Sequence, residues 1–225
     1  MRLPTSAILT VILAATWPAI GSTATPPASA TPPTPAASPA TAAAVPTKQA
    51  ATQAAMRDLW IGHIFWVRNV VAARLANNAG AAKVAEEQVV DNAKAIAGTI
   101  EPFYGKAASE KLFGLLAGHW GAISAYLDAT RAGNKADQDA ASKKLLDNAG
   151  EISTFLGGAN PHLPVETLRG LLNAHGAHHM EQIRQLKAGQ YEQEAATWSA
   201  MTKHMYVLAD ALIGGIAEQF PDKFR

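Results

Sequence analysis

The sequence predicts an all-α protein, a six-helix bundle built from three antiparallel helix hairpins that repeat every 56 residues. From about residue 49 onward, apolar residues recur at spacings of three and four, which is typical of amphipathic helices. The same pattern of apolar and histidine positions then returns twice at the 56-residue interval. Because self-similarity at a fixed period indicates a repeat architecture, we expect residues 51–225 to form one helical domain, with repeats at about 51–105, 106–161 and 162–220.

Two segments precede the predicted domain. Residues 1–24 have the pattern of a signal peptide, with Arg2, an apolar run at 8–20 and small residues up to Ala24, after which we expect cleavage. The run is shorter than the roughly 20 apolar residues of a membrane-spanning helix, so we expect the mature chain not to span a membrane. Residues 25–50 are mostly Ala, Pro, Ser and Thr, which predicts a disordered linker. We therefore expect a periplasmic or secreted protein.

The composition excludes several classes of function. The 225 residues include no cysteine, so disulfides, thiolate metal sites, iron–sulfur clusters and thiolate nucleophiles are ruled out. The 19 basic and 18 acidic side chains lack the basic excess of a nucleic-acid-binding domain. The helical region contains no phosphate-binding loop, nucleophile elbow or paired-carboxylate motif. We expect neither a nucleic-acid partner nor an enzymatic activity.

Within each predicted repeat, two helices carry matched residues. The first helix places an apolar residue three positions before a histidine, and the pairs are Trp60 and His63, Leu116 and His119, and Leu172 and His175. The second helix carries one polar residue among apolar ones, and these residues are Asn92, Asn148 and His204. The third repeat also differs by a further histidine, His179, four residues after His175. That spacing places both imidazoles on one helical face.

The turns between paired helices are also repeated. Asn77, Gly133 and Gly189 lie 56 residues apart, and Asn and Gly are the residue types that most readily take the left-handed conformation at a helix end. His63 lies 14 residues before Asn77 and Asn92 lies 15 after it, so the two should sit at nearly the same height, about 21 Å from the turn. The same count holds in the other repeats. The sequence therefore predicts a polar layer of four histidines and two asparagines inside an apolar bundle.

This layer has two interpretations. A buried polar side chain without a partner costs about 1–3 kcal/mol, so the layer must be hydrogen-bonded, hydrated or metallated. In one interpretation the residues bind a transition-metal ion such as Cu, Zn, Ni or Fe. The predicted ligands are then His63, His119, His175 and His204, with His179 as an additional ligand and Asn92 and Asn148 orienting the ligand rings. In the other, Asn–His hydrogen bonds make the core of a non-catalytic structural or partner-binding domain, with a protein as its partner.

The stretches 59–63 and 115–119 and the ending 219–224 resemble an uncharacterised family of exported bacterial helical proteins with a His-containing two-helix repeat. The resemblance covers about residues 56–225. It implies a histidine in the first helix of each unit and Asn, Asn and His in the second, and it implies no activity or cofactor. The sequence leaves open whether the hairpins close around a common axis, which would gather the histidines, or stack as an open array.

Overall fold

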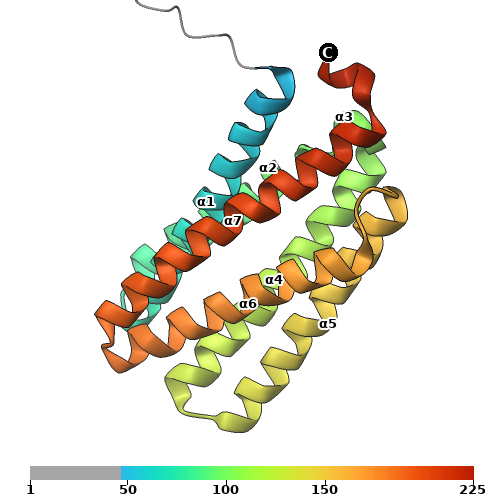
Figure 1. Cartoon of the computed structure of the whole chain (residues 1–225). Coiled ribbons are helices and arrows are strands. Elements are labelled where there is room, and N and C mark those ends of the chain that lie inside the picture. Colours follow the sequence, from blue (N-terminus) through green and yellow to red (C-terminus); the bar gives the residue numbers. More distant parts are fainter. Residues whose placement is uncertain (1–46) are drawn as a thin grey trace, which may run out of the picture. The chain divides into compact units, whose positions relative to one another are not determined.

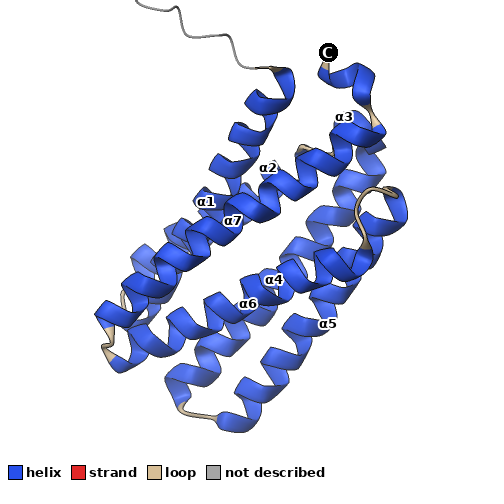
Figure 2. Ribbon diagram, in the orientation of Figure 1, coloured by secondary structure: helices blue, strands red, loops and turns tan. Residues whose placement is uncertain are grey.

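The computed structural model describes residues 47–225, and this part of the chain consists of helices and short loops without a strand (Figure 2). The predicted all-α class is therefore confirmed. Six long helices and two short ones follow one another: α1 (Lys48–Leu75), α2 (Ala79–Gly98), α3 (Glu101–Tyr104), α4 (Lys106–Ala132), α5 (Lys135–Ala159), α6 (Val165–Ala188), α7 (Tyr191–Gln219) and the 3₁₀ helix η1 (Pro221–Phe224). The predicted signal peptide and all but the end of the predicted linker lie outside the described residues.

Local chemistry explains where these helices begin and end. The side chains of Thr47, Asn78 and Asn134 accept hydrogen bonds from backbone N–H groups in the first turns of α1, α2 and α5, at 3.0–3.2 Å. At the other ends, φ is positive at Gly133 after α4 and at Gly189 after α6. Asn77 follows α1 with φ 55° and is the one non-glycine residue with positive φ among the described residues. The residue types that favour this conformation thus stand where the chain reverses.

The six long helices form a closed ring of contacts. In order around the ring, α1 packs on α2, α2 on α4, α4 on α5, α5 on α6, α6 on α7 and α7 on α1. Helix α6 also packs against both α1 and α4, so these three helices meet inside the ring. The turns joining α1 to α2, α4 to α5 and α6 to α7 all lie toward the lower left of Figure 1. No helix of the described part has the length and apolar character needed to cross a membrane.

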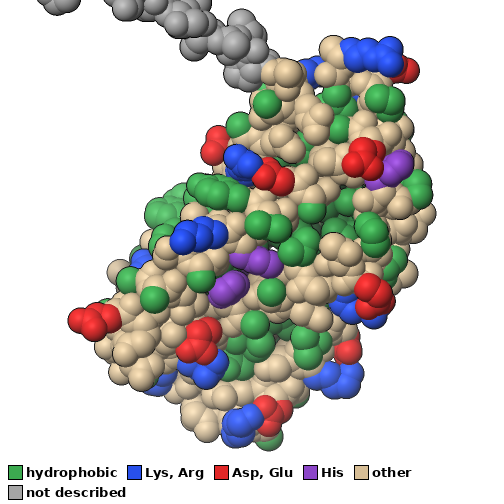
Figure 3. All heavy atoms as spheres, viewed as in Figure 1, with side chains coloured by type: hydrophobic (Ala, Val, Ile, Leu, Met, Phe, Trp, Pro, Cys, Tyr) green, Lys and Arg blue, Asp and Glu red, His purple; other side chains and the backbone are tan. Residues whose placement is uncertain are grey.

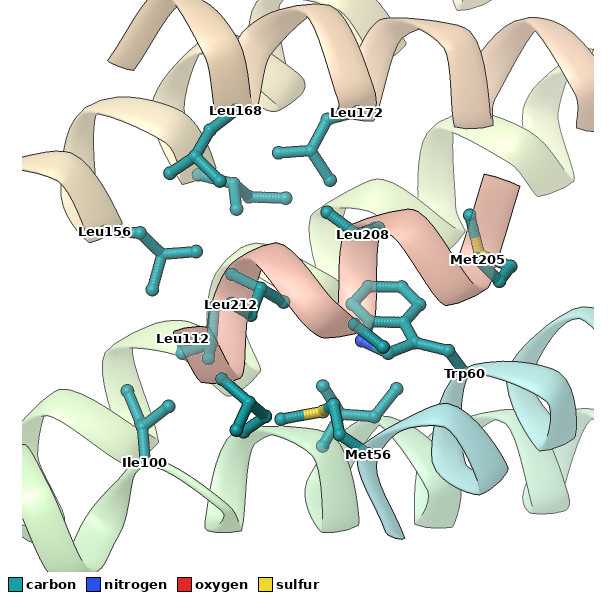
Figure 4. Close-up of a cluster of buried hydrophobic side chains, with 14 of the residues drawn as sticks. Met56, Trp60, Ile100, Leu112, Leu156, Leu168, Leu172, Met205, Leu208 and Leu212 are labelled. Carbon is teal, nitrogen blue, oxygen red and sulfur yellow. The ribbon is translucent and has the colours of Figure 1, made fainter. Parts of the chain in front are cut away.

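The interior is divided into two hydrophobic clusters. The larger cluster contains Trp60, Leu208 and many other apolar side chains from all six long helices (Figure 4). The smaller cluster lies toward the turns and includes Val67, Ile123 and Ile183. Along α1, α4 and α6, the histidines predicted for the polar layer come between residues of the larger cluster and residues of the smaller one. The fold therefore places imidazoles at the junction of two apolar regions.

Candidate metal centre

Four buried histidines occupy this junction. His63 comes from α1, His119 from α4, and His175 and His179 from successive turns of α6. Their exposed fractions are 7%, 4%, 0% and 1% in that order. The layer thus draws on the three helices that meet inside the ring, and it gathers four of the five histidines that the sequence predicts as metal ligands.

Three of the four lie close enough to share an ion. His63, His175 and His179 each offer a ring nitrogen such that all three nitrogens lie within 4.8 Å of one another. Their ring centres are 5.4 Å apart for His63–His175, 5.6 Å for His63–His179 and 4.5 Å for His175–His179. Metal–nitrogen bonds of about 2.0 Å place the ring centres of two imidazoles on one ion roughly 4.5 to 6 Å apart. The three rings therefore have the spacing of a coordination site.

The hydrogen bonding of this triad is incomplete. Both ring nitrogens of His63 and both of His175 are buried without a hydrogen-bond partner, as is Nε2 of His179. The indole Nε1 of Trp60 is also unpartnered, and its ring lies edge-on to those of His63 and His175 at 5.6 and 5.8 Å. Buried polar groups in folded proteins are nearly always paired, so nitrogens left unpartnered at one place require an ordered water molecule or a bound ion.

Burial also sets the charge state of the layer. Removal from water, together with a smaller effect of the neighbouring His119, lowers the pKa of His63 from 6.5 to about 3. Burial lowers the pKa of His119 to about 4, although its hydrogen bond with Asn148 acts in the opposite direction. The pKa values of His175 and His179 also fall well below 6.5, through burial first and the other histidines second. All four rings are neutral at pH 7, the form in which imidazole binds a metal.

His119 differs from the triad because it has a protein partner. Its Nδ1 lies 3.0 Å from Oδ1 of Asn148, while its Nε2 is buried and unpartnered. The Asn148 amide nitrogen donates to the carbonyl of Leu115, so the amide oxygen is the atom that faces the ring and must accept from Nδ1–H. The lone pair of Nε2 is then free. His119 stacks almost parallel to His175, with ring centres 5.7 Å apart.

In each pair of helices, the polar residue of the second helix forms a hydrogen bond with a backbone carbonyl of the first helix. Asn92 donates to the carbonyl of Leu59 at 2.9 Å, Asn148 to that of Leu115 at 3.0 Å, and Nε2 of His204 lies 2.8 Å from that of Leu171. Of the two asparagines predicted to orient ligand rings, Asn148 is the one that forms a hydrogen bond with a histidine. Oδ1 of Asn92 is buried without a partner, because the ring of His63 lies with His175 and His179 instead.

The fifth predicted ligand, His204, lies outside the triad. It is half-buried on α7, and its ring centre is 5.6 Å from that of His178 on α6. His178, which directly precedes His179 in the chain, is half-buried as well. The structure thus separates an inner group of histidines from an outer pair.

Two features beside the layer had no signal in the sequence. Cavities of about 20 and 40 Å³ lie on the side of the larger cluster, and the smaller one touches His63, His119 and His175. On the other side, the buried carboxylate of Glu194 accepts two bonds from Arg68 at 2.6 and 2.8 Å and one from Gln182 at 3.0 Å. A glutamate in the first turn of a helix is ordinarily exposed, so only the tertiary packing reveals this network.

Comparisons of the chain with protein-family models, with curated protein sequences and with solved structures find no match. The case for a function therefore depends on the geometry of the histidine layer.

Proposed function

We propose that this protein binds a transition-metal ion of the copper or zinc class through His63, His175 and His179. The observation that carries the proposal is the triad itself: three neutral, buried imidazoles whose ligand atoms lie within 4.8 Å of one another, with five of their six ring nitrogens buried and unpartnered. A shared ion would satisfy one lone pair of each ring. Nickel and iron also accept imidazole ligands, and metal titration distinguishes these ions.

His119 is the candidate for a fourth ligand. Its tautomer, with the proton on Nδ1 and the lone pair on Nε2, is the one that a hydrogen-bonded metal ligand adopts. Asn148 then acts as the residue that orients this ring. In this proposal the role of Asn92 is the bond to Leu59, which holds α2 against α1.

The neutral surroundings favour a singly charged ion. The buried layer contains imidazoles and apolar side chains, and the buried carboxylate of Glu194 is already paired with Arg68. The cost of moving an ion out of water rises with the square of its charge, so a divalent ion without an anionic ligand is much harder to bury than a monovalent one. Cu(I) combines a single charge with affinity for imidazole, and we place it ahead of Zn(II).

We infer that a three-hairpin repeat of 56 residues builds this site. The cyclic packing supports this inference, because the second helix of each hairpin contacts the first helix of the next: α2 with α4, α5 with α6, and α7 with α1. The bonds from Asn92, Asn148 and His204 to carbonyls 33 residues earlier support it as well. Closure of the ring brings the first helices, and hence their histidines, to the interior.

In this proposal the protein is exported and binds a transition-metal ion without catalysing a reaction. The apolar run at residues 8–20 and the small residues before position 25 support export to the periplasm or medium. In that setting the ion would be held inside the helical unit, because the inner histidines are at most 7% exposed.

A second candidate is a structural or partner-binding domain with a hydrogen-bonded core. The bond between His119 and Asn148 favours it, since that pair is satisfied without any ion. The unpartnered nitrogens of His63 and His175 weigh against it, because a hydrogen-bonded core should pair them as well.

The deciding experiment is metal analysis of the tagless mature protein. We expect about one tightly bound ion in the wild type after titration with Cu(I) or Zn(II), and its loss in a His175→Leu/His179→Leu variant, which keeps apolar bulk but removes two ligands. A His162→Leu variant is the matched control, because His162 is exposed and pairs with Glu218 instead. If the double variant binds the ion as tightly as the wild type, or if the wild type binds no ion, the proposed metal site is wrong. The structural or partner-binding domain is then the better interpretation.

A further inference from the structure

The outer histidine pair has features of a ligand site of its own. His178 and His204 come from α6 and α7, which pack together, and both are half-buried. Figure 3 shows histidine side chains at the molecular surface between these helices. Unlike the inner histidines, neither residue has a ring nitrogen that is both sealed from solvent and unpartnered. An ion in solution can therefore reach this pair without opening the bundle.

The hydrogen bond of His204 prepares it to bind an ion. The carbonyl of Leu171 can only accept, so the Nε2 atom 2.8 Å away must carry the proton. Nδ1 of His204 is then left with its lone pair and with no protein partner among the described residues. A ring whose second nitrogen donates to a backbone carbonyl is the usual arrangement of a metal-binding histidine.

The spacing of the pair also fits a shared ion. The ring centres of His178 and His204 are 5.6 Å apart, with the ring planes inclined by 55°. Two imidazoles on one ion have ring centres roughly 4.5 to 6 Å apart when the metal–nitrogen bonds are about 2.0 Å. Two ligands alone hold an ion weakly, with water completing the coordination, so this site would exchange its ion readily.

The outer pair adjoins the inner triad. His178 and His179 are consecutive on α6, and His204 lies across from Leu171, one helical turn before His175. An ion released by the outer pair therefore has imidazole ligands next to it on the interior side.

We propose that His178 and His204 form a second, weaker metal site that captures an ion from solvent and passes it to the inner triad. The transfer rests on the proposed function, whereas capture by the outer pair does not. Two successive sites would also help an ion to lose its bound water on the way to the inner triad. An ion must shed its water before entering an apolar interior, and stepwise exchange of water for imidazole avoids a bare intermediate.

The test compares the wild type with His178→Ala, a substitution at a half-buried position, and uses Cu(I), supplied in the absence of oxygen, as the sole probe. Calorimetry counts the bound ions, histidine modification read by mass spectrometry locates them, and tryptophan fluorescence follows loading beside Trp60. We expect the wild type to bind a second, weaker ion that protects His178 and His204 from modification. His178→Ala should lose that ion and load the inner site several-fold more slowly to the same final occupancy.

Two further variants keep the result interpretable. His204→Asn restores the residue type found at the equivalent positions 92 and 148, which can still donate to the Leu171 carbonyl, and it should behave as His178→Ala does. His162→Ala, at an exposed histidine paired with Glu218, should behave as the wild type.

Each outcome bears on one part of the proposal. An unchanged count of ions in His178→Ala overturns the outer site, and a lost ion with unchanged loading overturns the transfer. Retention of the weak ion by the His175→Leu/His179→Leu variant supports the outer site independently of the inner one. A wild type that binds the weak ion alone would refute the proposed function and the transfer while leaving capture by His178 and His204 intact.

Discussion

His63 and His119 stand at equivalent places in α1 and α4, yet their surroundings differ. His119 uses Nδ1 for the bond with Asn148, whereas neither nitrogen of His63 has a partner although Asn92 occupies the corresponding position. The difference comes from α6, where His175 and His179 provide an alternative set of neighbours for His63. One histidine of the matched pair thus uses a ring nitrogen in a bond within the protein, while the other has both ring nitrogens unpartnered.

This contrast predicts opposite effects of the same substitution on the metal-free protein. His119→Leu leaves the buried amide oxygen of Asn148 unpaired and should lower the free energy of unfolding by about 1–2 kcal/mol. His63→Leu removes two unpartnered nitrogens and should raise it by about 1 kcal/mol while weakening metal binding strongly. Urea denaturation of both variants measures the difference. Equal destabilisation would mean that His63 is hydrogen-bonded in solution as His119 is.

The lowered pKa values predict how stability depends on pH. In the unfolded chain His63 and His119 titrate near 6.5, but in the folded protein their pKa values are about 3 and about 4. Between these values the unfolded state binds more protons, so acid favours unfolding. Stability is therefore fully present above pH 6.5 and should fall by about 1.4 kcal/mol per pH unit for each such histidine as the pH drops toward 4.

The histidine contribution can be separated from that of the carboxylates by a difference measurement. The free energy of unfolding of metal-free wild type and of His63→Leu is compared between pH 7 and pH 4, where the variant should show the shallower slope. Parallel curves would show that the ring of His63 is not desolvated in the folded protein.

At the scale of the helices, close approach within a hairpin depends on small residues opposite the asparagines. A Cβ atom added at Gly62 would lie 3.2 Å from the amide nitrogen of Asn92, and one at Gly118 would lie 3.1 Å from that of Asn148. These amide groups cannot move away without losing their hydrogen bonds to the carbonyls of the facing helix. The glycines and asparagines therefore act together to set the distance between paired helices.

Two glycines of α4 provide a matched test of this view. Gly118→Ala should lower the free energy of unfolding by about 1–2 kcal/mol, because Asn148 must move or lose its bond. Gly121→Ala introduces a Cβ with no atom within 4 Å at an exposed helical position and should raise stability by about 0.5–1 kcal/mol. Thermal unfolding followed by circular dichroism measures both. A stabilising effect of Gly118→Ala would contradict a tight Gly118–Asn148 contact.

The helices were predictable from the sequence because their causes are local. Apolar residues recur along the helices, Asn78 and Asn134 cap α2 and α5, and residues suited to positive φ follow α1, α4 and α6. The common depth of His119 and Asn148 also followed from counting residues on either side of Gly133. The position of His204 did not follow, because its bond to the Leu171 carbonyl holds the ring between α6 and α7, away from the triad.

At the scale of the whole helical unit, contacts between the first and last long helices close the ring. Arg57 bonds Asp210, and Arg68 bonds Glu194, so two ion pairs join α1 to α7. Glu194 is 2% exposed and also accepts from Gln182 of α6, which ties three helices together. Whether hairpins close or form an open array depends on such long-range pairs, and for that reason the periodicity could not decide it.

Closure has a consequence for metal binding, because the triad joins helices that are far apart in the sequence. An ion held by His63 on α1 and by His175 and His179 on α6 would cross-link these two helices in the folded state alone. Binding that is specific to the folded state adds about 4 kcal/mol of stability when the ion is present at 1,000 times its dissociation constant. For a domain of this size, that gain should raise the melting temperature by roughly 10 °C.

Differential scanning calorimetry of the tagless protein with and without Cu(I) or Zn(II) measures this shift, and chelation should reverse it. The His175→Leu/His179→Leu variant should melt at the same temperature with and without the ion, since the cross-link between α1 and α6 cannot form. His178→Ala should keep the full shift at equilibrium, because the outer pair would change how the ion arrives and not how tightly the triad holds it. A shift of equal size in the double variant would mean that the ion acts elsewhere, and it would remove the inner triad as the site that couples metal binding to folding.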